Sequence, residues 1–355
     1  MNKKNIKKFN LQQTEDIIKK LSLPSYRTKQ LIQWIYKKYA NSIDEITEWS
    51  KSLRKTFSEK YYIGSIKLFD RKISKDRTQK FLWELEDGEK IESVLISDKH
   101  RLTLCISSQV GCPLKCRFCL TGKIGFKRNL QAWEIVDQFI QVSRLIKAEG
   151  LRAPQKVWDF LGTPRLTNIV FMGMGEPLLN FDNVVEALWR FKNLIEFSPR
   201  RITISTAGII PAIKELPYKA PPVKLAISLN ATDEKTRSFL MPINKKYPLH
   251  ELLKILREYP LKPGQRITFE YVMLKGINSS EEDALRLSQI LKGIPSKINL
   301  IPFNPWEKAE FEKPDEDEIL KFQEILASKG YSVFIRKSKG KDILAACGQL
   351  KAQYM

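Results

Sequence analysis

The sequence has little of several features that would assign it to other classes of protein. Its 355 residues include two histidines and five cysteines, and no apolar run approaches the roughly 18 residues of a membrane-spanning helix. The basic start is not followed by the apolar segment of a secretory signal. We therefore expect a cytoplasmic protein without membrane contact. Its cysteines should serve as ligands, catalysts or core residues rather than in structural disulfides.

Acidic residues are also few in comparison with basic ones. Lys and Arg number 61 against 40 Asp and Glu, which gives a formal net charge of +21. Such a charge favours a polyanionic partner, above all a nucleic acid, although a lysine-rich solvated surface is an alternative explanation. Hydrophobic residues make up 43% of the chain, enough to bury a core, so a wholly disordered chain is excluded.

Much of the positive charge lies near the N-terminus, where residues 1–80 contain 20 Lys or Arg and 8 Asp or Glu. The hydrophobic spacing predicts helices beginning near Thr14, over Ser25–Tyr39 and over Ile43–Lys60. We expect a basic helical RNA-binding domain over residues 1–62, with a helical cap bearing a solvated lysine face as the alternative. A β-strand extension over residues 63–100 follows, with strands over Ile66–Ile73, Lys80–Glu86 and Ile91–Ser97.

From residue 101 onward, strand and helix patterns alternate. This order predicts an α/β fold with a parallel sheet, and six to seven units favour a partial (β/α) barrel over residues 101–350. A doubly wound open sheet is the alternative, because the periodicity of the hydrophobic residues does not distinguish it from a partial barrel. The segment 151–167, with two prolines, is interpreted as an inserted loop. Strands are expected over Leu102–Ser107, Asn168–Met174, Arg201–Thr206, Lys224–Leu229, Arg266–Leu274, Lys297–Pro302 and Ser332–Arg336, and helices over Ala132–Leu145, Val184–Leu194, Leu249–Glu258, Glu281–Leu291 and Asp315–Ser328.

Three cysteines, Cys112, Cys116 and Cys119, lie in one short loop after the first of these later strands. Three thiolates on one loop can bind three irons of a 4Fe–4S cluster and leave the fourth iron open. The amino and carboxylate groups of S-adenosylmethionine (SAM) can chelate the open iron, and reductive cleavage of SAM gives a 5′-deoxyadenosyl radical. A structural zinc site is the weaker interpretation, because it needs a fourth ligand at a suitable spacing. The candidates for that ligand are His100, Cys105 and Cys347.

Five further blocks match a known family in order and spacing, over about residues 14 to 350. On these blocks the chain resembles the radical SAM adenosine methyltransferases of ribosomal RNA, the RlmN/Cfr family. The blocks are Leu104–Cys112, Phe171–Asn180, Met241–Tyr247, Lys297–Asn304 and Ala345–Leu350.

The resemblance implies which residues bind the cofactors. Cys112, Cys116 and Cys119 would hold the cluster, while Gly175 and Glu176 would bind the methionyl part of SAM. A carboxylate can pair with an ammonium, although by pattern alone this turn could carry a surface acid. Many relatives have His in place of Asn230, so the detail of that contact stays open. The remaining implied SAM contacts are Ser205, Ser228, Leu229, Asn230 and Asn304.

The resemblance also implies the chemistry of the two other cysteines. Cys347 would accept a methyl group from one SAM and become S-methylcysteine, and a second SAM would generate a radical on that methyl group. After the radical has added to carbon 2 of adenine, Cys105 would resolve the protein–RNA adduct through a transient disulfide with Cys347. Glu92 matches the proton acceptor. Without the resemblance, the two cysteines would be buried thiols and Glu92 a solvated acid.

The substrates that the resemblance implies are adenosine 2503 of 23S rRNA and, for several members, adenosine 37 of some tRNAs. An external reductant such as flavodoxin would supply electrons. Two alternatives stay open: a carbon-8 adenosine methyltransferase of the Cfr type, which confers antibiotic resistance, and a non-catalytic RNA-binding metal protein. Basic residues near the cysteine loop are expected to hold RNA phosphates; these are Lys115, Arg117, Lys123, Lys127 and Arg128.

Overall fold

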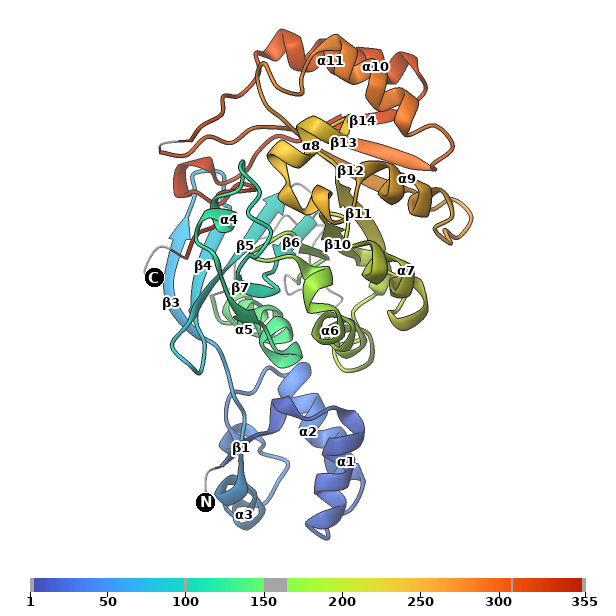
Figure 1. Ribbon diagram of the computed structural model, residues 1–355. Helices are drawn as coiled ribbons and strands as arrows, with labels where there is room; N and C mark the ends of the chain where they lie inside the picture. Colours follow the sequence, from blue (N-terminus) through green and yellow to red (C-terminus); the bar gives the residue numbers. More distant parts are fainter. Residues whose placement is uncertain (1–2, 99–100, 150–164, 308, 353–355) are drawn as a thin grey trace.

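The computed structural model describes residues 3–98, 101–149, 165–307 and 309–352 (Figure 1). His100 and most of the expected inserted loop lie outside these ranges. No helix among the described residues is long and apolar enough to cross a membrane.

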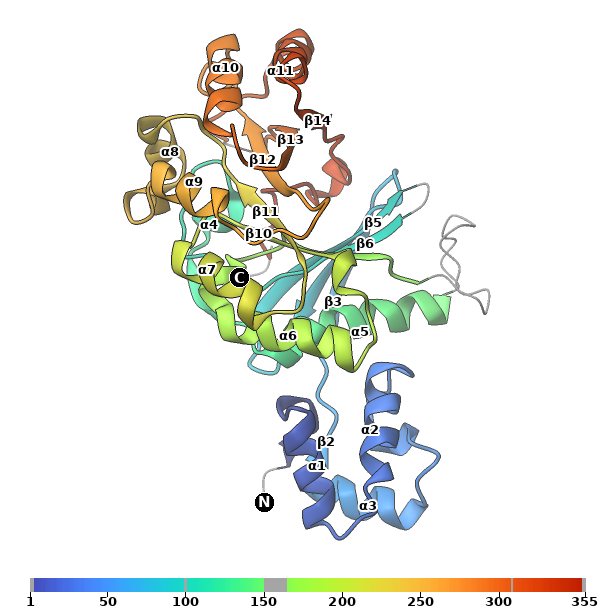
Figure 2. The same ribbon diagram turned by 90° about the vertical axis from the view of Figure 1, so that its right-hand side faces the viewer.

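The N-terminal part forms three helices, α1 (Leu11–Lys20), α2 (Tyr26–Tyr36) and α3 (Lys51–Lys60), and a short parallel pair of strands, β1 (Lys4–Asn5) with β2 (Tyr61–Tyr62). In Figures 1 and 2 this unit lies at one end of the molecule, below α5 and α6. The expected helical character is confirmed, but two helix starts were wrong.

Local capping explains both differences. The Asn10 side chain accepts a hydrogen bond from the backbone of Gln13, and the Gln13 side chain bonds back to Asn10, so the helix begins before Thr14. Residues Ile43–Glu45 form only a 3-10 turn. The helix that follows starts after Ser50, whose hydroxyl accepts a hydrogen bond from the Leu53 backbone.

A buried ion pair attaches the N-terminal unit to the rest of the molecule. Lys7 Nζ lies 2.6 Å from Asp137 on α5 (Ala132–Glu149), and both side chains are almost fully buried. Arg190 on α6 (Phe181–Asn193) donates a hydrogen bond to the Lys7 carbonyl. Because a buried charge is costly unless it is paired, these contacts specify how the unit docks.

A ten-stranded sheet forms the centre of the molecule, in the order β14-β13-β12-β11-β10-β9-β6-β5-β4-β3. The seven strands from β6 to β14 are parallel and follow one another in chain order, whereas β3, β4 and β5 add to one edge as antiparallel strands. The bounds are β3 (Lys67–Ile73), β4 (Gln79–Glu84), β5 (Lys90–Asp98), β6 (Arg101–Cys105), β9 (Asn168–Phe171), β10 (Ile202–Thr206), β11 (Lys224–Ser228), β12 (Ile267–Met273), β13 (Ser296–Pro302) and β14 (Ser332–Ile335).

This arrangement confirms the partial (β/α) barrel. A doubly wound sheet reverses its strand order at a switch point, and no reversal occurs here. The expected strands are present, with ends that differ by a few residues.

Helices cover the outer face of the curved sheet (Figures 1 and 2). They are α5, α6, α7 (Ile210–Lys219), α8 (Glu234–Leu240), α9 (Leu249–Arg257), α10 (Glu281–Ile290) and α11 (Glu316–Ser328). Helices α7 and α8 were not among the expected ones. Prolines in the first and last turns of α7 obscure its helical pattern.

The cysteine loop is framed by a small hairpin of β7 (Gln109–Gly111) and β8 (Phe126–Asn129), with the one-turn helix α4 (Leu120–Lys123) inside it. Gly111 has a φ of 74°, and a Cβ there would lie 1.9 Å from the Gly125 carbonyl oxygen. Only glycine fits this close approach of the two strands. The hairpin therefore holds the loop at the carboxyl ends of the parallel strands.

Candidate active site

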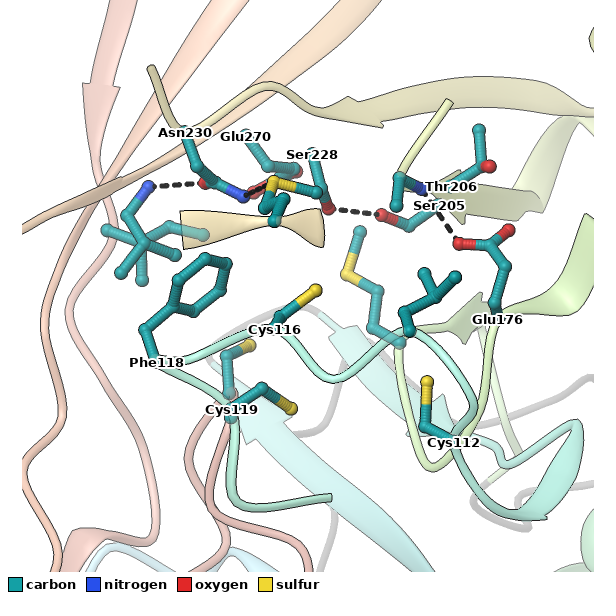
Figure 3. Close-up of a pocket in the computed structure, with 18 of the residues that line it drawn as sticks. Cys112, Cys116, Phe118, Cys119, Glu176, Ser205, Thr206, Ser228, Asn230 and Glu270 are labelled. Carbon is teal, nitrogen blue, oxygen red and sulfur yellow. Dashed lines mark hydrogen bonds between the residues drawn. The ribbon is translucent and has the colours of Figure 1, made fainter. Parts of the chain in front are cut away.

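The cysteine loop and the carboxyl ends of the parallel strands enclose a cavity of about 930 Å³, part of it open to solvent. This is the end of a βα fold at which functional residues gather. Figure 3 shows the cysteine loop on one side and polar side chains from β10, β11 and β12 on the other. The predicted site residues in the lining are Cys112, Cys116, Cys119, Gly175, Glu176, Ser205, Ser228, Asn230, Asn304 and Cys347.

The three cysteines of the loop all line this cavity, and their predicted role as cluster ligands stays a prediction. Cys112 and Cys116 are buried, and Cys119 is half-buried. Burial raises the thiol pKa of all three, that of Cys112 to about 12. Among the described residues, no three His, Cys, Asp or Glu side chains converge on a single ion. This arrangement differs from a single-ion site but suits a cubane cluster, because each thiolate of a cluster binds a different iron and the ligands lie further apart.

Glu176 is a buried carboxylate in the wall of the cavity. Its Oε2 accepts a hydrogen bond from the Ala207 backbone at 2.8 Å, and its Oε1 accepts one from Leu178 at 3.0 Å. Burial raises the pKa of this carboxyl group to about 7, despite these two hydrogen bonds. Gly175 has a φ of 97°, and a Cβ there would lie 2.5 Å from Gln109. A cation placed beside Glu176 would favour its ionised form.

The polar residues opposite the cysteine loop come from several strand ends. Ser205 and Ser228 lie on neighbouring strands with their hydroxyls 3.5 Å apart. Asn230 Oδ1 accepts a hydrogen bond from the Val272 backbone, and its Nδ2 lies 3.3 Å from Met241 Sδ. Leu229 is buried and is not part of the cavity lining.

Asn304 provides a direct sign that the cavity fits a polar ligand. Its Oδ1 is buried and has no hydrogen-bond partner, while its Nδ2 lies 3.4 Å from the Cys347 carbonyl oxygen. A buried acceptor without a partner is costly, so such an atom in a cavity wall indicates a bound donor. The lining therefore fits a cluster on the three cysteines with a polar ligand beside it, within reach of Glu176 and Asn304.

Glu270 is a site residue that was missed at the sequence level. It lies on β12, lines the cavity and accepts a hydrogen bond from Asn299 at 2.9 Å; burial raises its pKa. A charged residue within the apolar run Ile267–Met273 is the only signal for it. Its side chain shares a face with Thr268 and Val272, as the period of a strand requires.

A second cavity adjoins the first and brings Cys105 and Cys347 together. It measures about 660 Å³, part of it open to solvent, and both cysteines line it. Cys105 is buried, and burial together with the nearby Cys347 thiol raises its pKa. Cys347 lines both cavities, and its exposed surface faces them. Arg336, Lys337 and Lys339 add positive charge to the second cavity.

Glu92 lies apart from the lining of both cavities. It is buried, its Oε1 is 3.0 Å from Lys80 Nζ, and its Oε2 accepts a hydrogen bond from the Lys351 backbone at 2.9 Å. Its role as a proton acceptor stays a prediction.

The basic residues near the cysteine loop differ in their surroundings. Arg117 and Lys123 both pair with Glu310, and Arg128 pairs with Asp87 and Glu134. Lys115 and Lys127 are exposed. Three of the five residues expected to hold phosphates are therefore engaged in ion pairs within the protein.

Comparison with known families agrees with this geometry. The family model of the radical SAM superfamily matches residues 106–288, and that of the ribosomal RNA large subunit methyltransferase N-terminal domain matches residues 4–63. The partial barrel and the three-cysteine cavity at its strand ends thus belong to a radical SAM enzyme.

Full-length relatives narrow the assignment. Proteins named dual-specificity RNA methyltransferase RlmN from Desulfosudis oleivorans and Syntrophobacter fumaroxidans are 47% and 44% identical to this chain, over 93% and 98% of it and 86% and 98% of their own lengths. A crystal structure of a radical SAM methyltransferase from Sphaerobacter thermophilus matches with a TM-score of 0.91 and 36% identity, covering 99% of this chain and 100% of that one. The chain belongs to the RlmN family.

Proposed function

We propose that this protein methylates carbon 2 of adenosine 2503 in 23S rRNA and of adenosine 37 in some tRNAs. The observation that carries the proposal is the place of Cys347, which lines both the cavity of the three-cysteine loop and the cavity of Cys105. A methyl carrier needs access to a donor on one side and to a substrate and a resolving thiol on the other. The names of the relatives, which cover nearly the whole chain, support RNA as the substrate.

Cys112, Cys116 and Cys119 would hold a 4Fe–4S cluster, which with SAM supplies a carbon-centred radical when both are bound. The carboxylate of Glu176 would pair with the SAM ammonium, and Gly175 lets the backbone approach closely. Asn304 would use its unpaired Oδ1 to accept a hydrogen bond from SAM. Further contacts would come from Ser205, Ser228 and Asn230, which line the cavity, whereas Leu229 does not reach it.

Cys347 would form a bond to the methyl group of one SAM, releasing S-adenosylhomocysteine. The radical obtained from a second SAM would take one hydrogen atom from that methyl group and leave as 5′-deoxyadenosine, after which the methyl carbon would bond to carbon 2 of adenine. Although Cys347 is exposed toward the cavities, the protein around it removes water from the thiol and raises its pKa, so the thiol must lose its proton before it accepts the methyl group. Glu92 would accept the proton from carbon 2. Cys105 would attack the Cys347 sulfur, which breaks its bond to the methyl carbon and forms the disulfide.

The partners follow from charge and chemistry. We place a helical RNA-binding domain at residues 1–62, a strand extension at 63–100 and the catalytic domain at 101–350. Exposed lysines on α1 and α2 supply cations for RNA phosphates; these are Lys19, Lys20 and Lys29. The radical reaction needs an external one-electron reductant, for which a cytoplasmic flavodoxin is suited. Adenine in an unpaired loop can be extruded from its stack so that carbon 2 reaches the active site.

Mass spectrometry of rRNA and tRNA nucleosides from cells with and without this protein tests the proposal. We expect 2-methyladenosine at the two positions only when the protein is present. Appearance of 8-methyladenosine instead would overturn the assigned carbon, and identical nucleoside profiles would overturn the function.

A further inference from the structure

A buried ion pair lies next to the chain segment that carries Cys347. Lys80 on β4 and Glu92 on the neighbouring strand β5 stand 3.0 Å apart, with side chains only 4% and 2% exposed. Removing two charges from water is costly, and such a pair is retained only where further hydrogen bonds complete it. Those further bonds all go to one segment.

We call residues 344–351 the carrier loop, because Cys347 lies within it. Lys80 Nζ donates a hydrogen bond to the Leu344 carbonyl at 3.2 Å, at the start of the loop. Glu92 Oε2 accepts one from the Lys351 backbone at 2.9 Å, at the end of the loop. One ion pair therefore holds both ends of the carrier loop, although the loop lies more than 250 residues after Lys80 and Glu92 in the sequence.

The carrier loop depends on such contacts because it has no helix or strand of its own. Leu344 and Gly348 both adopt left-handed backbone conformations, with φ values of 52° and 81°. Its other hydrogen bonds to outside groups are neutral. Leu120 donates to the Gly348 carbonyl, and Thr121 donates to the Leu350 carbonyl. Asn304 donates to the Cys347 carbonyl, and Gln349 donates to the Pro305 carbonyl. Hydrogen bonds to charged groups are stronger than these neutral ones, so the ion pair is the firmest attachment.

We propose that Lys80 is a positioning residue for methyl transfer, acting with Glu92 as a latch on the carrier loop. While the latch is closed, Oε1 of Glu92 faces Lys80, Oε2 is bonded to Lys351, and Cys347 lines both cavities. Both oxygens of Glu92 are thus engaged within the protein, and release of Lys351 frees Oε2 to accept a proton from the substrate. Release of the carrier loop and exposure of the Glu92 carboxylate to substrate are therefore the same event. This inference rests on the proposed roles of Cys347 and Glu92.

Hydrogen–deuterium exchange of the reconstituted holoenzyme tests the latch without requiring RNA methylation. In Lys80→Met, amides of the carrier loop should exchange roughly tenfold faster or more, because a charge-assisted bond at Leu344 is lost and Glu92 is left unpaired. Lys80→Arg, which keeps a donor cation, should restore slow exchange. The matched control is Lys7→Met, which breaks the equally buried pair with Asp137 far from the loop and should leave loop exchange unchanged.

A second variant covers the case in which Lys80→Met does not fold. Lys80→Met/Glu92→Gln leaves no buried charge unpaired, and its loop should still exchange faster because Leu344 has lost its donor. Unchanged loop exchange in this variant, or an equal rise in Lys7→Met, would overturn the latch.

Product ratios give a readout that general destabilisation would not move. In Lys80→Met the amount of 5′-deoxyadenosine formed per methyl group transferred should rise, because SAM cleavage needs the cysteine loop whereas transfer also needs a positioned Cys347. An unchanged ratio would contradict the positioning role. If the wild-type protein transfers no methyl group, the proposed function fails, and the exchange experiment still decides the latch.

Discussion

Replacing Glu176 with Gln should change how the stability of the protein depends on pH. Glu176 is 3% exposed, and burial raises its pKa from the ordinary 4.5 to about 7. Between these two values the folded protein keeps a proton that the unfolded chain has lost. The free energy of unfolding therefore falls as pH rises through this window, and the loss is complete above the folded pKa.

The magnitude follows from the difference between the two pKa values. A difference of about 2.5 pH units corresponds to roughly 3 kcal/mol, at about 1.4 kcal/mol per unit. This is a large part of the stability of an ordinary domain. The cost of ionising this buried carboxylate has a function in the proposed reaction, because the ammonium of SAM would compensate its negative charge.

Urea unfolding of the cluster-free protein, under reducing anaerobic conditions at pH 4.5 to 8, measures this effect. Relative to Glu176→Gln, the wild type should lose about 3 kcal/mol between the two ends of the range. Glu215→Gln, at an exposed position on α7, is the control and should show no such trend. A difference between wild type and Glu176→Gln that stays constant with pH would refute the reasoning.

Three further predictions concern the cofactor and RNA. Cys112→Ala, Cys116→Ala or Cys119→Ala should each abolish the iron–sulfur absorbance and SAM cleavage, and an intact cluster in any of them would contradict the ligand assignment. Gly175→Ala should lose SAM binding in equilibrium dialysis, because its Cβ would lie 2.5 Å from Gln109; unaltered affinity would show that the turn tolerates a side chain. Replacing Lys19, Lys20 and Lys29 with Gln should lower the slope of log affinity for RNA against log salt by about 0.7 to 0.9 per lost phosphate contact. An unchanged slope would mean that this charge serves solvation.

Neutralising these lysines is a better test of RNA binding than deleting the N-terminal helices. Deletion would remove Lys7 and leave Asp137 as an uncompensated buried charge. Exposed lysines on α1 and α2 can be changed without that cost.

Patterns of neighbouring residues in the sequence predicted the order of the strands and helices and the loop that carries the three cysteines. Alternating strands and helices predicted the partial barrel. The spacing of Cys112, Cys116 and Cys119 singled out the loop that lines the main cavity. The start of α1 was misplaced because Asn10 and Thr14 are both good helix-capping residues, and only the observed hydrogen bonds separate them.

Contacts between distant segments could not be predicted in the same way. Lys80 in a strand suggests a solvated surface residue, and only the pairing of β4 with β5 places it beside Glu92. The approach of the carrier loop to this pair depends on the C-terminal segment folding back across the sheet edge. Glu270 likewise becomes a site residue only through the register of β12 with β13.

The roles proposed for Cys347 and Cys105 are the central claim, and trapping of RNA on the protein tests them most directly. Cys105→Ala should form the bond between the methyl carbon and adenine but fail to break it, so it should accumulate as a slow gel band that nuclease removes. Cys347→Ala has no methyl acceptor and should form no such band, and the wild type should show little because the disulfide step clears the adduct. Normal turnover by Cys105→Ala, or cross-linking by Cys347→Ala, would contradict the account.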